Sequence, residues 1–318
     1  HTRFKCDWSS DCALPIWFIG LRYLKAKRKQ TFISIITVIS IAGVTVGVMA
    51  LIVVLAVMSG FEKTLKEKIL GTQAHLILLK AGQEGMGHYE EVTKELGEVK
   101  GVVSAAPVIY NQVMLSSESN VSGVFLKGID PDLEGKVTEL ARNMKAGSLQ
   151  SLKKPQDGNL PGIILGVELA KNLSVSVSDT LQVISPLGTM TPMGMMPKMK
   201  RFRVVGIFYS GMYEFDNTFA YISIESAQKF FDMDSRVTGI EIKIDDVYRV
   251  KEVGKTIRQR LGFPFWTKDW MEMNRNLFSA LRMEKIAMFI ILLLIVLVAA
   301  CNIIYTLFMV VMEKTRDI

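Results

Sequence analysis

Cysteine and histidine are scarce in this chain, with three residues of each type among 318. Cys6, Cys12 and Cys301 all lie outside the long polar segment in the middle of the chain, so no disulfide can stabilise that segment. The three histidines are isolated from one another, whereas a metal site needs several ligands at close spacing. The sequence therefore argues against a disulfide-linked scaffold and against a metal centre.

Motifs of known enzymes are missing as well. Gly254–Thr256 resembles the end of a phosphate-binding loop, but that loop needs a glycine where Arg249 stands, and the surrounding pattern predicts a helix. Gly82–Gly87 contains three glycines without a helix pattern after the last of them, which argues against a dinucleotide fingerprint. No nucleophile has a recognisable base beside it. We therefore expect a non-catalytic protein without a cofactor.

Charged residues are absent from two long stretches, Thr31–Phe61 and Ile286–Met312. Each stretch exceeds the roughly 20 residues that an α-helix needs to cross the hydrocarbon core of a bilayer. Every backbone polar group must be satisfied internally in lipid, so each stretch is predicted to be a spanning helix. The sequence therefore predicts a large aqueous domain that is anchored in a membrane at both of its ends.

The distribution of basic residues predicts the orientation of these spans. The net charge is +7, and five basic residues without an acid lie between Arg22 and Lys29, just before the first span. Such a cluster marks the cytoplasmic side of a span much more often than it binds nucleic acid. We therefore expect a cytoplasmic N-terminus, an exported middle domain, a cytoplasmic return at Lys314 and Arg316, and no nucleic-acid partner.

Helical patterns continue beyond both spans. Apolar residues keep helical spacing through Ser59–Gly71, and Gly71 suits a C-cap. At the other end, Asp269 and Glu272 form a plausible helix start, and no glycine or proline interrupts the sequence from Trp270 into the second span. The sequence predicts two helical stalks that flank the middle domain.

The middle segment alternates between strand and helix patterns, which predicts an α+β domain of two lobes, with the second inserted into the first. The expected strands are Ala74–Leu79, Val102–Leu115, Val121–Gly128, Gly162–Gly166, Thr180–Ser185, Phe202–Phe208, Thr218–Ser223 and Gly239–Ile244. The expected helices are Tyr89–Val99, Glu168–Leu173, Ile224–Phe231 and Val247–Leu261.

One segment of the middle domain, Ile184–Lys200, has an unusual composition. It holds three prolines, two glycines and five of the 18 methionines of the chain. Prolines and glycines argue against a central strand, and methionine suits an adaptable apolar surface. The composition fits a partner-binding loop, and it also fits an ordinary long hairpin whose methionines fold back on the domain.

Five short strings give the chain a specific resemblance. They are Phe18–Leu24, Gly47–Leu51, Val57–Glu62, Arg282–Lys285 and Val311–Lys314. In this order they closely resemble the LolC/LolE permeases, the membrane subunits of the lipoprotein-releasing ABC transporter. The wider superfamily includes MacB-type efflux pumps and the cell-division permease FtsX.

The resemblance implies a multi-pass protein of the bacterial inner membrane with a MacB-like periplasmic core. Such a permease subunit extracts lipoproteins bound for the outer membrane and passes them to a periplasmic carrier. Its implied partners are a LolD-like cytoplasmic ATPase, a second permease subunit (LolE-like or a second copy), a LolA-like carrier and a triacylated lipoprotein. ATP hydrolysis belongs to the separate ATPase.

In LolC-type subunits a proline-rich hairpin called the hook recruits the carrier, and the Ile184–Lys200 segment matches its position and its Thr-Pro-Met-Gly core. The implied carrier-binding residues are Pro186, Thr191, Pro192, Met193, Gly194, Met196 and Pro197. Acylated lipoproteins also need an apolar path, which the outer-leaflet ends of the two spans could line. The candidates for this path are Val54, Val57, Met58, Phe61, Phe278, Met283, Ala287 and Ile291. The same residues fit lipid-facing or helix-packing surfaces, because a spanning helix is apolar on all sides.

Five segments are expected along the chain. They are a disordered or non-native start (1–15), a cytoplasmic flank with the first span (16–61), the periplasmic domain with its hook-like loop (62–285), the second span (286–312) and a truncated cytoplasmic coupling segment (313–318). The truncation is expected because the family continues with a coupling helix and two more spans. The alternatives are a MacB/FtsX-like mechanotransmission permease, for efflux or cell-wall hydrolase regulation, and a two-span periplasmic sensor.

Overall fold

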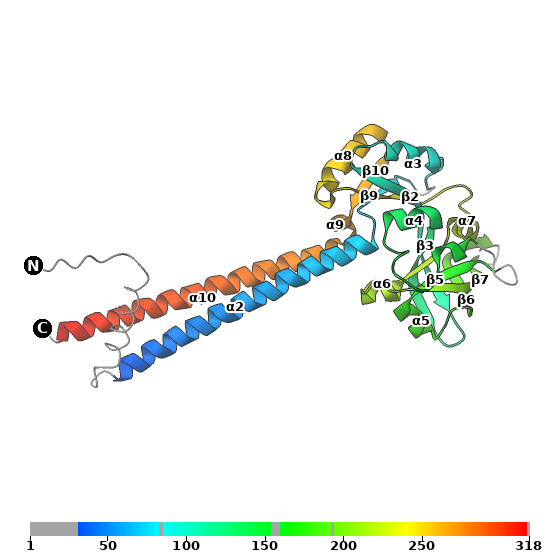
Figure 1. Cartoon of the computed structure of the whole chain (residues 1–318). Coiled ribbons are helices and arrows are strands. Elements are labelled where there is room, and N and C mark those ends of the chain that lie inside the picture. The colour runs from blue at the N-terminus through cyan, green and yellow to red at the C-terminus, as the bar shows by residue number, and fades with distance from the viewer. Residues whose placement is uncertain (1–30, 83–84, 154–159, 192–193, 317–318) are drawn as a thin grey trace, which may run out of the picture. The chain divides into compact units, whose positions relative to one another are not determined.

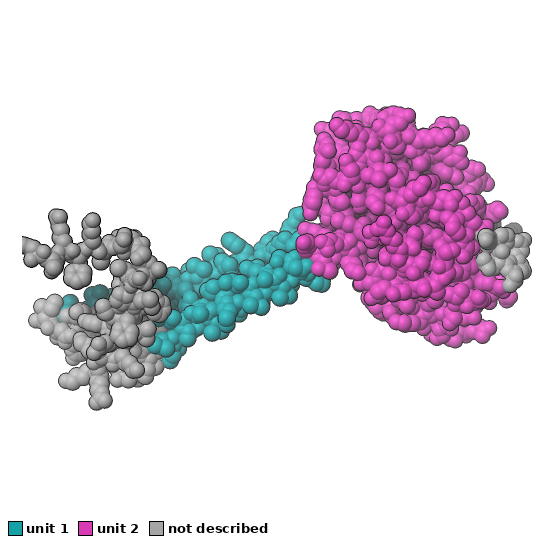
Figure 2. Space-filling model, viewed as in Figure 1, with its two compact units in different colours: residues 1–62, 279–318 teal, residues 63–278 magenta. Residues whose placement is uncertain are grey.

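The computed structural model describes residues 31–82, 85–153, 160–191 and 194–316 (Figure 1). Its residues divide into two compact units, shown in different colours in Figure 2. The first, here called the helix pair, comprises the described residues of 1–62 and 279–318. The second, here called the body, is Lys63–Phe278. The start predicted to be disordered, 1–15, lies outside the described residues.

Two antiparallel helices, α2 (Thr31–Thr72) and α10 (Arg275–Arg316), supply the helix pair. Both are long and apolar enough to cross a membrane. The less exposed positions recur every three or four residues on each helix, which is the spacing of knobs-into-holes packing. On α2 they include Ser40, Val44, Gly47, Leu51, Met58 and Glu62, and on α10 Leu281, Glu284, Met288, Leu292, Ile295, Ala299, Asn302 and Thr306.

The first helix continues through the predicted stalk and ends at Thr72. Gly71 lies within its last turn, so the prediction that it caps the helix is wrong. The carbonyl of Gly71 accepts a hydrogen bond from the backbone N–H of Glu139 at 2.9 Å. A Cβ on Gly71 would lie 2.9 Å from Oε2 of Glu139, an atom at the end of a flexible side chain that can move aside.

The predicted helix start at Asp269 is confirmed, but the continuous helix expected after it is not. Asp269 and Glu272 form a capping box at the start of α9 (Trp270–Met273). The helix then breaks at Asn274, whose side-chain amide donates to the carbonyl of Trp270 and to Oε1 of Gln73, both at 2.8 Å. A side chain that competes for backbone groups ends a helix without glycine or proline.

Ten strands of the body form one connected sheet, in the order β10-β1-β9-β2-β3-β8-β5-β7-β4, with β6 paired to β2 and β7. The strands are β1 (Leu76–Lys80), β2 (Val102–Ser116), β3 (Val121–Ile129), β4 (Met144–Gly147), β5 (Gly162–Gly166), β6 (Thr180–Thr191), β7 (Gly194–Phe208), β8 (Phe219–Ser223), β9 (Gly239–Ile244) and β10 (Phe265–Asp269). The pairs β3–β8 and β5–β7 are parallel, and the others are antiparallel. The α+β class is confirmed, and the ten strands are connected in one sheet.

Short helices cover the sheet, and Figure 1 shows α8 beside β10 and α5 and α6 beside β5. They are α3 (Tyr89–Gly97), α4 (Pro131–Val137), η2 (Leu149–Leu152), α5 (Val167–Leu173), α6 (Tyr213–Thr218), α7 (Ile224–Phe231), η4 (Val247–Arg249) and α8 (Val250–Leu261). In α7 the buried residues Ile224, Ala227 and Phe230 recur every three positions and join the main core. Ser223 caps α7 by accepting from the N–H of Ser226.

Three elements of the body, α4, α6 and β10, are not among the helices and strands predicted from the sequence. Helix α4 begins with Asp130, whose side chain accepts from the N–H of Asp132, and with Pro131 at the first helical position. Helix α6 ends at Thr218, where a strand was predicted to begin, and β8 begins one residue later. Strand β10 is only five residues long and lies next to the capping box.

Candidate functional site

An apolar crevice lies between α2 and α10 of the helix pair. Its volume is about 340 Å³. Ten residues line it, namely Leu55, Met58, Ser59, Glu62, Leu281, Glu284, Lys285, Met288, Phe289 and Leu292. Most of them come from the heptad-spaced faces of the two helices, so the packing of the pair itself creates the crevice.

An ion pair crosses this crevice at one end. Oε2 of Glu62 on α2 lies 2.7 Å from Nζ of Lys285 on α10. The Glu62 side chain is 17% exposed, whereas that of Lys285 is 68% exposed. The crevice therefore has an apolar stretch around Met58 and Met288 and a charged end that links the two helices.

Of the residues predicted to line a lipid path, Met58 lies in the crevice. The other predicted positions on the spans are exposed on the surface of the helix pair: Val54, Val57, Phe61, Met283, Ala287 and Ile291. Phe278 belongs to the body, where its ring packs edge-on against Trp270 at 5.1 Å. Their role in a lipid path stays a prediction.

Most residues of the crevice were not predicted, although their spacing along α10 identifies them. Residues Leu281, Glu284, Met288 and Leu292 recur at intervals of three and four, as the contact face of a helix pair does. The mixture of charged and apolar residues at these positions hides the pattern from a search for an apolar stripe. The neighbouring stripe at Met283 and Ile291 is more uniformly apolar, and it faces outward.

Strands β6 and β7 form a hairpin that includes the described residues of Ile184–Lys200, so the backbone of this segment is the long hairpin that the sequence left open beside a loop. Pairing continues from Ser185 opposite Lys198 to Thr191 opposite Gly194, with a register shift between Ser185 and Thr189. The shift explains how prolines fit here: Pro186 and Pro197 lie at the irregular part of the ladder, where regular backbone hydrogen bonds are not required.

Gly188 is required by the backbone of this hairpin. A Cβ at this position would lie 1.6 Å from the carbonyl oxygen of Met196 on the opposite strand. No other residue allows this close approach of the two strands. The irregular ladder therefore depends on Gly188, and together they determine the backbone path of the hairpin from Gly188 to its tip.

Several predicted carrier-binding residues are on the exposed part of the hairpin. Pro186, Met196 and Pro197 are exposed, and Met199 further down the same strand is exposed as well. Thr191 and Gly194 pair with each other at the end of the ladder. Pro192 and Met193 lie outside the described residues. An exposed methionine and two exposed prolines give the hairpin an apolar surface that suits a protein partner.

A separate cleft of about 520 Å³ lies beside the hairpin. Gly188 and Lys198 of the hairpin line it together with Lys80, Arg236 and Trp266 from other parts of the body. Lys198 forms an ion pair with Asp232, which also lines the cleft. The charged lining makes this cleft a poor site for an acyl chain.

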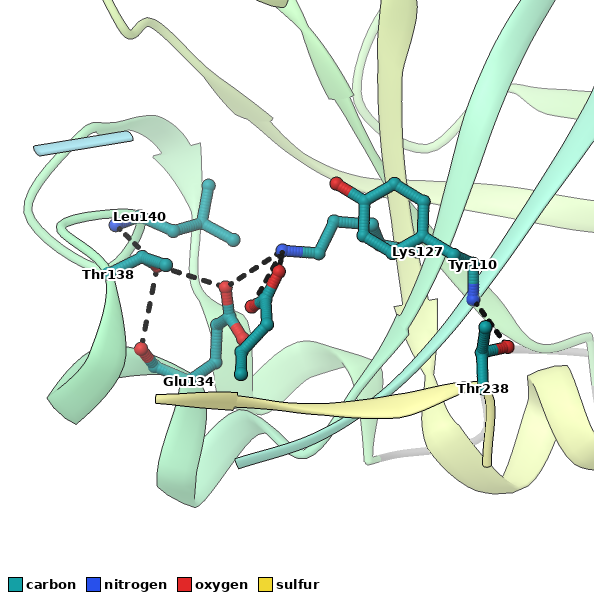
Figure 3. A network of polar contacts seen from close by, with 7 residues as sticks. Tyr110, Lys127, Glu134, Thr138, Leu140 and Thr238 are labelled. Carbon is teal, nitrogen blue, oxygen red and sulfur yellow. Dashed lines mark hydrogen bonds and ion pairs between the residues drawn. The ribbon is translucent and has the colours of Figure 1, made fainter. Parts of the chain in front are cut away.

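The body also contains a buried ionic cluster, centred on Lys127 of β3 (Figure 3). Nζ of Lys127 lies 2.9 Å from Oε1 of Glu241 on β9 and 3.5 Å from Oε1 of Glu134 on α4. Thr138 donates a hydrogen bond to the same Glu134 oxygen at 2.9 Å. Burial opposes the charge of Lys127, but Glu134 and Glu241 outweigh it and hold its pKa well above the ordinary lysine value.

No group of three or more potential metal ligands lies together among the described residues. His75 is buried and accepts a hydrogen bond at Nδ1 from the backbone N–H of Ile244, 3.2 Å away. Burial lowers the pKa of His75, helped by the positive charge of Lys243. The aspartates that precede or follow helices have local roles, as Asp246 caps η4. The polar groups of the body thus serve its packing.

Known proteins with these features are membrane permeases. The family of MacB-like periplasmic core domains matches residues 37–260. The lipoprotein-releasing system transmembrane protein LolC of Neisseria meningitidis serogroup B is 39% identical over 310 residues, covering 96% of this chain and 72% of that protein. LolC of Xylella fastidiosa strain 9a5c is 40% identical over 300 residues, covering 94% of this chain and 71% of that protein.

Among solved structures, the periplasmic region of MacB from Actinobacillus actinomycetemcomitans covers 66% of this chain and 94% of its own length. It is 15% identical to this chain, with a TM-score of 0.39. Two apolar helices and an α+β body with a MacB-like core define a transmembrane protein of the permease class. The chain belongs to the LolC family of lipoprotein-releasing system transmembrane proteins.

Proposed function

We propose that this chain is the permease subunit of an inner-membrane ABC transporter that releases lipoproteins and passes them to a periplasmic carrier. Two relatives named as LolC of lipoprotein-releasing systems share 39–40% of their residues with it over nearly its whole length. The observation in the structure that favours this function most is the apolar crevice between α2 and α10. An apolar groove between two spans is the kind of site that an acyl chain needs.

The energetics of lipid transfer explain why such a crevice matters. Burial of an acyl chain contributes about 0.8 kcal/mol per CH₂ group, so exposing one chain of ordinary length to water costs on the order of 10 kcal/mol. A triacylated lipoprotein must therefore follow a continuous apolar route from the membrane to the carrier. In this proposal Leu55, Met58, Met288 and Leu292 begin that route.

The exposed apolar stripes of the helix pair have a place in the same proposal. Val54, Val57 and Phe61 on α2, and Met283 and Ile291 on α10, are exposed in the single chain. A second permease subunit, LolE-like or a second copy, would turn these stripes into the walls of a larger lipid path. A separate LolD-like ATPase would supply the motion.

The β6–β7 hairpin is the proposed docking site for a LolA-like carrier. It presents Pro186, Met196 and Pro197 on an exposed surface, and its ladder holds the two strands together up to Thr191 and Gly194. Rigid presentation lowers the entropy cost of binding. A carrier held there would receive the lipid without releasing it into water.

Site-specific photocrosslinking tests the lipid path directly. A photoreactive amino acid at Met58, in the complete protein assembled with its transporter partners in proteoliposomes, should capture the acylated end of a lipoprotein. The physical reason is that Met58 lines the apolar crevice. The measurement is the covalent adduct, detected by mass spectrometry of the acylated peptide.

The matched control is Ala56, which is exposed and lies on the far side of α2, two residues from Met58. Ala56 should capture membrane phospholipid and little or no lipoprotein. Equal capture of lipoprotein at both positions, or none at Met58, would contradict the proposed lipid path.

A further inference from the structure

The Glu62–Lys285 ion pair lies near one end of the crevice. It joins α2 to α10 across the groove, with 2.7 Å between the carboxylate oxygen and the ammonium nitrogen. Glu284, next to Lys285, also lines this end. Among the residues that line the crevice, these three are the charged ones, and they lie together.

The order of residues along the two helices makes the crevice asymmetric. Leu55 and Met58 on α2, with Met288 and Leu292 on α10, form the apolar stretch. One turn further along α2 and one turn back along α10, the lining changes to the ion pair. An acyl chain that moves along the crevice from Met58 toward Leu281 therefore passes the Glu62–Lys285 pair.

We propose that the Glu62–Lys285 pair is a gate that closes the crevice to hydrocarbon and must separate before lipid leaves it. This inference rests on the proposed function and assigns one residue pair to the last step of lipid release within the membrane. Hydrocarbon cannot solvate a charge, so the paired groups exclude an acyl chain from this end of the crevice. Lys285 remains in contact with water, and an ion pair that water reaches is weak enough to open during each cycle.

A reversible tether across the gate tests this proposal. The complete protein, with its native cysteines replaced by serine, would carry Glu62→Cys and Lys285→Cys and be assembled with its ATPase in proteoliposomes. A short bifunctional methanethiosulfonate links the two cysteines, and dithiothreitol releases them. The tethered protein should lose at least nine-tenths of its lipoprotein release while ATP hydrolysis continues, and reduction should restore release.

A second tether serves as the matched control because it joins the same helices elsewhere. A Cβ at Gly47 would lie 3.9 Å from Cγ2 of Ile295, so Gly47→Cys and Ile295→Cys can be linked by the same reagent. This tether should leave release within twofold of the untethered protein. Release that survives the tether at 62 and 285 would overturn the gate, and so would equal loss with both tethers, since the helices would then have to part along their whole length.

Photocapture separates failure of the gate from failure of the proposed function. With the gate tethered, a photoreactive group at Met58 should still capture lipoprotein, because lipid enters the crevice but cannot leave it. Capture at Met58 together with unaffected release would overturn the gate alone. Absence of capture at Met58 in the untethered protein would count against the lipid path on which the gate depends.

Charge reversal gives an independent test of the same pair. Glu62→Lys and Lys285→Glu each place like charges across the crevice and hold the two groups apart, so each should raise lipoprotein release in the absence of ATP at least threefold. The double reversal restores an attractive pair and should remove at least half of this ATP-independent release. Two single variants that both show no more ATP-independent release than the unmodified protein would overturn the gate.

Discussion

Lys127 connects parts of the body that lie far apart in sequence. Its ammonium group on β3 contacts Glu241 on β9 and Glu134 in the middle of α4. The segment after α4 then reaches the first stalk helix, since the N–H of Glu139 donates to the carbonyl of Gly71. A single buried side chain thus stands between the centre of the sheet and the end of α2.

Replacing Lys127 with methionine should destabilise the body strongly. The change would leave Glu134 and Glu241 buried without their cation, and removing one partner of a buried pair typically costs about 3–5 kcal/mol. Urea unfolding of the chain in detergent, followed by near-ultraviolet circular dichroism, measures the loss. The double variant Lys127→Met with Glu241→Gln should recover part of it, because one unpaired carboxylate is removed.

Lys171→Met provides the control for a general effect of losing a lysine. Lys171 pairs with Glu168 three residues away, and its side chain is 65% exposed. Its loss should leave the urea midpoint nearly unchanged, since exposed ion pairs contribute little. Similar midpoints for the two lysine variants would contradict the importance of the buried cluster.

Individual helices and strands were predictable where local pattern and packing agree. The bounds of α7 and β9 match the predictions because a cap and an amphipathic face define the first, and isoleucines that alternate with Glu241 and Lys243 define the second. The break at Asn274 was not predictable, because it depends on a contact with Gln73 about two hundred residues away. The extension of β6 and β7 past Pro186 and Pro197 was missed because proline argues against strands, and only the irregular register makes room for them.

Gly188→Ala should distort the hairpin and leave the body stable. The added methyl group would lie 1.6 Å from the carbonyl oxygen of Met196, so the two strands must move apart. Carrier binding in the complete protein, measured by pull-down with a LolA-like carrier, should fall at least fivefold. The melting temperature should change by less than about 2 °C, since no core residue is affected.

Gly123→Ala is the matched control for this substitution. A Cβ at Gly123 would meet nothing within 4 Å, and the glycine lies on β3, which pairs with β2 and β8 and with neither strand of the hairpin. This variant should bind the carrier as well as the unmodified protein does. Unchanged binding by Gly188→Ala would contradict the assignment of the hairpin as the docking site.

At the scale of the whole molecule, composition was enough to predict two spans around an α+β domain, and the structure and relatives confirm this organisation. The face of each span that contacts the other was not predictable. Apolar residues surround both helices, so hydrophobicity favoured the exposed stripe at Val54 and Val57 as much as the crevice at Leu55 and Met58. Only the packing of one helix against the other separates these two faces.

The division into two units predicts that the body folds without the membrane. Residues 63–278 contain the ten-stranded sheet and its main apolar core. The two ends of the body are also joined to each other, because Asn274 donates to the side chain of Gln73 at 2.8 Å. A domain of this length buries roughly 70% of the surface that its unfolded chain exposes, which is sufficient for independent stability.

The excised segment 63–278 should therefore unfold in one cooperative thermal transition and should bind the carrier through the same hairpin. Circular dichroism and calorimetry measure the transition, and pull-down measures the binding. Asn274→Leu in the excised segment removes the link between its ends and should lower the melting temperature by a few degrees, as expected for the loss of about one hydrogen-bonded contact. A broad, non-cooperative transition of the unmodified segment would show that the body depends on the spans for its fold, because the core alone would then be too weak to order the sheet.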